Sequence, residues 1–201
     1  MNNLKITIFD NNDEIINVFK EEFIDTDINI LRCDVRNLKD FDCIMSPGNS
    51  YGLMDGGIDL ILEEMFEIQL RVQKIIQKDY YGEQPIGTCF LLNTYNPNIR
   101  NLAHVPTMRI PTDVSQTYNA YYAFRSLLST ILNFNKNNKG KVISIACTAL
   151  CTGAGKMNYK TSAKQMRLAY ENIISDKKIC WDNAYKTDNL LKNSLLPQRK
   201  R

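Results

Sequence analysis

Hydrophobic and polar positions follow two periods along the chain. Short runs that alternate or are continuously apolar predict strands at residues 4–9, 28–33, 42–45, 86–94, 102–105 and 142–147. Apolar residues three or four positions apart predict a helix after Asn12 or Asp13 and further helices at 58–77, 115–134 and 161–174. Strands that alternate with helices are typical of an α/β sandwich with a largely parallel sheet.

The chain shows no internal repeat and no interdomain linker. At 201 residues it is long enough to bury a sizeable core. We therefore predict a single domain over residues 1–185 and a loosely attached basic tail over 186–201. The tail contains Lys192, Arg199, Lys200 and Arg201. A short basic tail is usually a solvated terminus, so we rank nucleic-acid binding last among the functions considered.

Composition narrows the chemistry. A single histidine excludes a His-rich zinc site and any mechanism that needs two imidazoles. The six cysteines contain no Cys-x-x-Cys pair, and the net charge is only +3. No run approaches the roughly 18 apolar residues of a membrane span, and the first ten residues lack a secretory signal. We expect a cytoplasmic protein with reduced thiols, no membrane partner, no metal and no organic cofactor.

Two segments rich in small residues follow predicted strands, at 46–59 and 151–156. Ligands of parallel sheets bind outside the carboxyl ends of the strands. Glycine lets the backbone approach a ligand, and a helix N-terminus favours an anion. Neither segment is a P-loop or a dinucleotide fingerprint, because Gly155-Lys156 is followed by Met157 and Gly-x-Gly-x-x-Gly is absent. The pair of segments indicates phosphate binding.

Four motifs in order resemble those of macro domains. The first segment begins Ser46-Pro47-Gly48-Asn49, similar to the family's Asn-Ala-Ala-Asn, and ends Gly56-Gly57-Ile58-Asp59, similar to Gly-Gly-Val-Asp. Cys33-Asp34-Val35-Arg36 resembles Gly-Asp-Ile-Thr, and Thr152-Gly153-Ala154-Gly155 resembles the family's Ser-Thr-Gly phosphate loop. The resemblance covers about residues 4–174. It implies a three-layer α/β/α sandwich with a mixed, largely parallel sheet.

The resemblance also implies a ligand, which is ADP-ribose, free or carried by an ADP-ribosylated protein or metabolite. Asp34 would accept a hydrogen bond from adenine, beside the backbone of Val35, and Asn49 would bind the distal ribose. A strand-end turn for Asp34 and an Asx-turn for Asn49 are the structural alternatives. The implied ligand-binding residues are Asp34, Val35, Asn49, Gly56, Gly57, Ile58, Thr152, Gly153, Ala154 and Gly155.

The implied catalytic residues are Asp59, Asn49 and His104. Asp59 would activate or orient a water, although a carboxylate in the first turn of a helix also complements the helix dipole. His104 would process a terminal phosphate, unless it is simply a packed side chain. We therefore expect hydrolysis of ADP-ribose conjugates, as a mono-ADP-ribosyl hydrolase or an ADP-ribose 1''-phosphate phosphatase.

The sequence departs from the family pattern at several positions, including Pro47 and Met54-Asp55, and two of the departures bear on the choice of function. Ser46 replaces the first asparagine, and Ala154 and Gly155 stand where the family often has an aromatic residue over the distal ribose. These departures favour the alternative function, a non-catalytic module that reads or sequesters ADP-ribose or a related nucleotide. Arg109 and Asp113 are further candidates to line the site.

Overall fold

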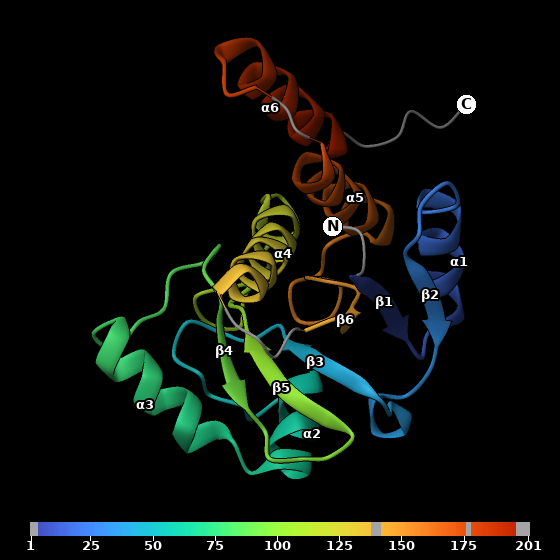
Figure 1. Cartoon of the computed structure of the whole chain (residues 1–201). Coiled ribbons are helices and arrows are strands. Elements are labelled where there is room, and N and C mark those ends of the chain that lie inside the picture. The colour runs from blue at the N-terminus through green and yellow to red at the C-terminus, as the bar shows by residue number, and fades with distance from the viewer. Residues whose placement is uncertain (1–3, 138–141, 176–177, 196–201) are drawn as a thin grey trace.

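The computed structural model describes residues 4–137, 142–175 and 178–195. Its centre is a six-stranded sheet in the order β2-β1-β6-β3-β5-β4 (Figure 1). The strands are β1 Lys5–Asp10, β2 Asn29–Arg32, β3 Phe41–Ser46, β4 Phe90–Asn93, β5 Ile99–His104 and β6 Ser144–Thr148. Neighbouring strands run parallel except β4, which is antiparallel to β5. The predicted mixed, largely parallel sheet is confirmed.

Helices cover both faces of the sheet. They are α1 Asp13–Glu22, α2 Gly57–Phe66, α3 Gln69–Asp79, α4 Asn119–Asn137, α5 Tyr159–Ile174 and α6 Trp181–Leu195, with a 3₁₀ turn, η1, at Val35–Asn37. One face carries α1, α4 and α5, and the other carries α2 and α3 (Figure 1). The three-layer α/β/α sandwich is therefore confirmed.

Alternation along the central strands explains the two cores. Cys43 and Met45 of β3 pack into the core beneath α1, α4 and α5, whereas Ile44 between them packs into the core beneath α2 and α3. All three side chains are fully buried. A strand buried on both faces reads as a continuous apolar run, which is how β3 appears in the sequence.

The single helix predicted over 58–77 is wrong, because two helices, α2 and α3, occupy this stretch. Glu67 ends α2 in the left-handed conformation, with φ of 49°. The Glu63 carboxylate then accepts hydrogen bonds from the backbone N–H groups of Ile68 and Gln69, at 2.7 and 2.6 Å. These bonds satisfy donors at the start of α3, so the break is stabilised by one side chain.

Two other elements begin four residues later than predicted. The strand expected over 86–94 covers only Phe90–Asn93, because Thr88 closes a turn on Pro85 and Gly87 has φ of 83°. The helix expected from residue 115 begins at Asn119. Residues 114–117 instead form a separate turn, in which the N–H of Thr117 donates to the carbonyl of Val114 at 3.1 Å.

The loosely attached tail expected from residue 186 is also wrong as far as residue 195, because 186–195 belong to α6. Leu191 and Ser194 lie three positions apart, on one face of this helix, and both are buried. The Ser194 carbonyl accepts a hydrogen bond from Thr161 Oγ1 of α5 at 3.0 Å. Residues 196–201, with Arg199, Lys200 and Arg201, lie outside the described residues.

Candidate functional site

A cavity of about 370 Å³ opens at the carboxyl ends of β1, β3 and β6. The two glycine-containing segments predicted from the sequence both form parts of its wall. From the first segment come Pro47, Gly48, Asn49, Leu53, Asp55, Gly56, Gly57, Ile58 and Asp59, and from the second come Cys151, Thr152, Gly153, Ala154 and Gly155. The structure thus brings together both predicted phosphate-binding segments at one edge of the sheet.

The first segment presents the N-terminus of α2 to the cavity. Gly56 is the N-cap residue and has no side chain that could cap the helix. The first N–H groups of α2 can therefore bind an anion. Gly57 has φ of 59°, a conformation that favours glycine. A Cβ atom at Gly56 or Gly57 would meet no described atom within 4 Å, so the backbone borders open space.

The second segment is a tight loop after β6. The N–H of Lys156 donates to the carbonyl of Gly153 at 2.9 Å, and the N–H of Met157 donates to that of Cys151 at 2.9 Å. Gly153 borders open space, whereas a Cβ at Gly155 would lie 2.6 Å from the Cys151 carbonyl oxygen. Gly153 therefore leaves room for a ligand, and Gly155 is needed to close the loop.

Asp59 lies in the cavity wall and is only 6% exposed. Ser46 at the end of β3 donates a hydrogen bond from Oγ to Asp59 Oδ1 at 2.7 Å. Burial raises the pKa of Asp59 to about 6; the Ser46 bond lowers this pKa and the nearby charge of Asp55 raises it. Asp59 is therefore mostly ionised at neutral pH but can carry a proton under mildly acidic conditions. Such a carboxylate suits a general base.

His104 is the last residue of β5 and pairs in register with Ser46 of β3. Its Nδ1 lies 2.6 Å from Gln84 Oε1, and Gln84 Nε2 donates to the His104 carbonyl at 3.4 Å. This assignment puts the ring proton on Nδ1 and leaves Nε2 as an acceptor. Nε2 is buried without a hydrogen-bond partner among the described residues. Burial lowers the pKa of His104 to about 4, so the ring is neutral at neutral pH.

Gly48 separates His104 from the cavity. A Cβ atom at Gly48 would lie 2.5 Å from His104 Nε2 and 3.0 Å from Asp59 Oδ2, so both side chains press against this glycine. His104 is fully buried and does not line the cavity. The structure therefore places His104 behind the wall, where it supports Gly48 rather than facing a ligand.

Asn49 lines the cavity, but its side chain organises its own loop. Its Oδ1 accepts hydrogen bonds from the N–H groups of Tyr51 and Leu53, at 3.0 and 3.3 Å. Its Nδ2 donates to the Leu53 carbonyl at 2.7 Å. The Asx-turn is thus present. An amide nitrogen carries two hydrogens, so Asn49 retains one donor for a ligand.

Asp34 and Val35 lie in a second, adjoining hollow of about 210 Å³. Asp34 accepts a hydrogen bond from the N–H of Arg36 at 2.8 Å, which starts η1. The second hollow shares Asp10, Ile58 and Thr148 with the main cavity. The two compartments together suit an elongated ligand whose two ends differ in chemistry.

Three polar residues of the cavity wall were missed by the sequence analysis: Asp10, Thr107 and Thr148. Asp10 and Thr148 end β1 and β6, so the rule that ligands bind at strand ends could have found both. Thr107 donates from its backbone N–H to the Gly48 carbonyl at 2.9 Å and holds the floor of the site in place. Nothing in the sequence pattern marks Thr107.

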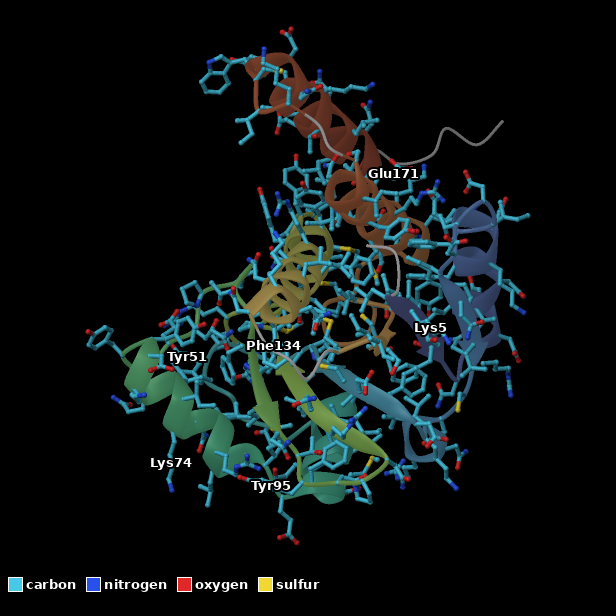
Figure 2. All side chains as sticks on the ribbon, viewed as in Figure 1. Lys5, Tyr51, Lys74, Tyr95, Phe134 and Glu171 are labelled. Atoms are coloured by element: carbon cyan, nitrogen blue, oxygen red, sulfur yellow. The ribbon has the colours of Figure 1, made fainter. Side chains whose placement is uncertain are left out.

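Neither Arg109 nor Asp113 lines the cavity. Arg109 donates to both oxygens of Glu83, at 2.7 and 2.9 Å, and contacts the Tyr51 hydroxyl. Tyr51 lies near α3 at the edge of the molecule (Figure 2). Asp113 instead accepts a hydrogen bond from the N–H of Ser115 at 2.9 Å. These residues stabilise the rim of the site.

The charged side chains of the cavity wall are all negative among the described residues. Asp10, Asp55 and Asp59 line it, and no Lys, Arg or His of the described chain does so. The described residues contain no cluster of His, Cys, Asp and Glu that could hold a metal ion, and none of their helices has the length and apolar character needed to cross a membrane. An anionic ligand would therefore be held by backbone N–H groups.

The fold and site define an α/β/α protein with a glycine-lined cavity at the carboxyl ends of its strands. The family model of the macro domain matches residues 45–166, and the chain belongs to the macro domain family. An uncharacterized protein of Aquifex aeolicus is 24% identical over 140 residues, which cover 70% of this chain and 78% of that protein.

Solved macrodomains share the fold. The macrodomain of Mycobacterium tuberculosis DarG is 20% identical, with a TM-score of 0.58, and the match covers 70% of this chain and 88% of that one. An Oceanobacillus iheyensis macrodomain mutant with ADPR is 14% identical, with a TM-score of 0.57 and coverage of 77% and 84%. The same organism's macrodomain with ADP is also 14% identical, with a TM-score of 0.57 and coverage of 78% and 84%.

Proposed function

We propose that this macro domain binds ADP-ribose and hydrolyses ADP-ribose conjugates. The observation that carries the proposal is one cavity that both glycine segments line, with Asp59 in its wall. The Oceanobacillus iheyensis macrodomains with ADPR and with ADP support the choice of ligand. Further support comes from the adjoining hollow, because a nucleotide needs one compartment for its base and another for its phosphates.

In this proposal the adenine ring occupies the hollow lined by Asp34 and Val35. The diphosphate lies between the N-terminus of α2 and residues 153–155, where backbone N–H groups and the helix dipole compensate its charge. The remaining amide hydrogen of Asn49 binds the distal ribose. The phosphates need no cationic side chain in this arrangement.

Asp59 acts as the general base on the bound conjugate. Its ionised carboxylate takes a proton from a water whose oxygen attacks the anomeric carbon of the distal ribose. The bond between that carbon and the acceptor oxygen breaks, and the acceptor leaves with the bonding electron pair as a carboxylate. The products are ADP-ribose with a free hydroxyl and the unmodified acceptor.

Ester-linked conjugates fit this site better than ADP-ribose 1''-phosphate. A terminal phosphate would add negative charge to a cavity that already holds three carboxylates. His104, which the phosphatase alternative needs, lies behind Gly48. We therefore place mono-ADP-ribosylated proteins and ADP-ribose esters ahead of phosphatase substrates.

One observation favours the second candidate, a non-catalytic reader. Asp59 is 6% exposed and its Oδ1 is already bound to Ser46, so little of the carboxylate reaches the cavity. A non-catalytic module needs only the backbone N–H groups that bind the diphosphate and the hollow that binds adenine. Both candidates predict ADP-ribose binding and differ only in turnover.

The test is to incubate the protein with an acceptor protein that carries ester-linked mono-ADP-ribose, and separately with ADP-ribose 1''-phosphate, and to quantify released ADP-ribose by chromatography. Asp59→Asn should lower turnover by at least about 100-fold while ADP-ribose still binds. Glu64→Gln is the matched control, because it removes an exposed carboxylate from the same helix. Binding without any product from the wild type would select the reader, and full activity of Asp59→Asn would remove the assigned role.

A further inference from the structure

Asp10 lies where the two compartments of the site meet. It is the last residue of β1 and lines both the main cavity and the adjoining hollow. Ile58 and Thr148 also line both, but Asp10 is the only charged residue that the two linings share. A ligand with its base in one compartment and its diphosphate in the other must pass its first ribose beside this carboxylate.

Local contacts hold the Asp10 carboxylate in a defined orientation. Oδ1 accepts a hydrogen bond from the N–H of Asn12 at 2.9 Å, next to the start of α1. Oδ2 accepts one from Thr148 Oγ1 at 3.4 Å, at the end of the neighbouring strand β6. Each carboxylate oxygen can accept two hydrogen bonds, so both oxygens keep capacity for ligand hydroxyls. The side chain is half-buried and so remains accessible.

The surroundings of Asp10 disfavour a further anion. The adjoining hollow holds a second carboxylate, Asp34, and its described lining includes no Lys, Arg or His. Asn11 and Thr148 supply neutral polar groups. The backbone cradle proposed for the diphosphate lies in the main cavity. Arg36 lies outside both linings and pairs with Asp34, with 3.8 Å between Nη1 and Oδ1, and with Glu64. A phosphate on the first ribose would therefore face the Asp10 carboxylate with no cation among the described residues that line either compartment.

We infer that Asp10 accepts hydrogen bonds from the ribose hydroxyls of the adenosine half and excludes ligands with a 2'-phosphate on that ribose. The inference rests on the proposed function and makes it more specific. Like charges brought together at a binding interface strongly suppress the wrong partner. The site then selects ADP-ribose conjugates whose adenosine ribose has free hydroxyls.

The experiment is a calorimetric titration of the wild type with ADP-ribose and with ADP-ribose 2'-phosphate. We expect the 2'-phosphate to bind about 100-fold more weakly. Asp10→Asn removes the charge and keeps the shape. It should reduce the ratio of the two dissociation constants, ADP-ribose 2'-phosphate over ADP-ribose, by at least about tenfold. Asp10→Ser, smaller and also neutral, should change the ratio in the same direction, so the test survives if one variant fails to fold.

Asp13→Asn is the matched control. Asp13 lies three residues further along, is 72% exposed and pairs with Arg32 outside both hollows, so its loss should leave the ratio unchanged. Equal binding of both ligands by the wild type, or an unchanged ratio in both Asp10 variants, would overturn the inference while ADP-ribose binding stands. Absence of ADP-ribose binding to the wild type would refute the proposed function and the inference with it.

Discussion

Replacing Asp59 by asparagine should make the protein more stable at neutral pH while it removes turnover. The carboxylate is 6% exposed, and burial raises its pKa from 3.8 to about 6. A raised carboxyl pKa means that the folded state binds more protons than the unfolded state between these two pH values. The stability of the wild type therefore falls as pH rises through this window. Above it, the full loss of unfolding free energy caused by ionising the buried Asp59 is present.

The size of the effect follows from the shift. One pKa unit corresponds to about 1.4 kcal/mol, so a shift of about two units costs about 3 kcal/mol once Asp59 is ionised. Asparagine carries no charge and keeps an oxygen for the hydrogen bond that Ser46 donates at 2.7 Å. The variant should therefore regain up to about 3 kcal/mol at about pH 8 and close to nothing at about pH 4.

Urea unfolding followed by circular dichroism at both pH values measures this difference. With a slope of about 2 to 3 kcal/mol per molar, the midpoint of Asp59→Asn should rise by about 1 M at the higher pH. Glu64→Gln on the exposed side of α2 should leave the midpoint nearly unchanged. A loss of stability in Asp59→Asn at about pH 8, or an equal gain at both pH values, would refute the electrostatic argument.

Three further substitutions test other parts of the site and fold. Ser46→Ala removes a hydrogen bond that lowers the pKa of Asp59, which is about 6. The midpoint of the acidic limb of the pH–rate profile should therefore move to a higher pH. Gly155→Ala places a Cβ 2.6 Å from a backbone oxygen of its own loop, so calorimetry should show weaker ADP-ribose binding and a stability loss of about 1 to 3 kcal/mol. Asp42→Ala removes the acceptor of three hydrogen bonds from the start of β6, and denaturant unfolding should show a loss of about 3 kcal/mol.

Local pattern was enough to predict an α/β sandwich with a largely parallel sheet and the position of the site, and the resemblance to macro domains implied the three layers. Alternating strands and helices imply parallel pairing, and parallel pairing brings the ends of β3 and β6 to one edge of the sheet. The segments at 46–59 and 151–156 therefore meet without any knowledge of their contacts. Asp59 was predicted from the resemblance of Gly56-Gly57-Ile58-Asp59 to the family's Gly-Gly-Val-Asp motif, and the structure places it at the start of α2.

Contacts between distant residues explain what the sequence did not predict. The break between α2 and α3 depends on Glu63 capping the second helix, which periodicity does not reveal. Ser46 reads as a departure from the family pattern, yet it binds Asp59, 13 positions away. His104 reads as a possible catalyst, but the register of β3 and β5 places it behind Gly48.

The central claim is that the two glycine segments and the hollow beside Asp34 form an ADP-ribose site. A calorimetric titration of the wild type with ADP-ribose, with AMP as the control for the base and a single phosphate, tests this claim most directly. We expect micromolar or tighter binding of ADP-ribose and much weaker binding of AMP, because only ADP-ribose fills both compartments. No heat with ADP-ribose at several temperatures, or equal affinity for both ligands, would contradict it.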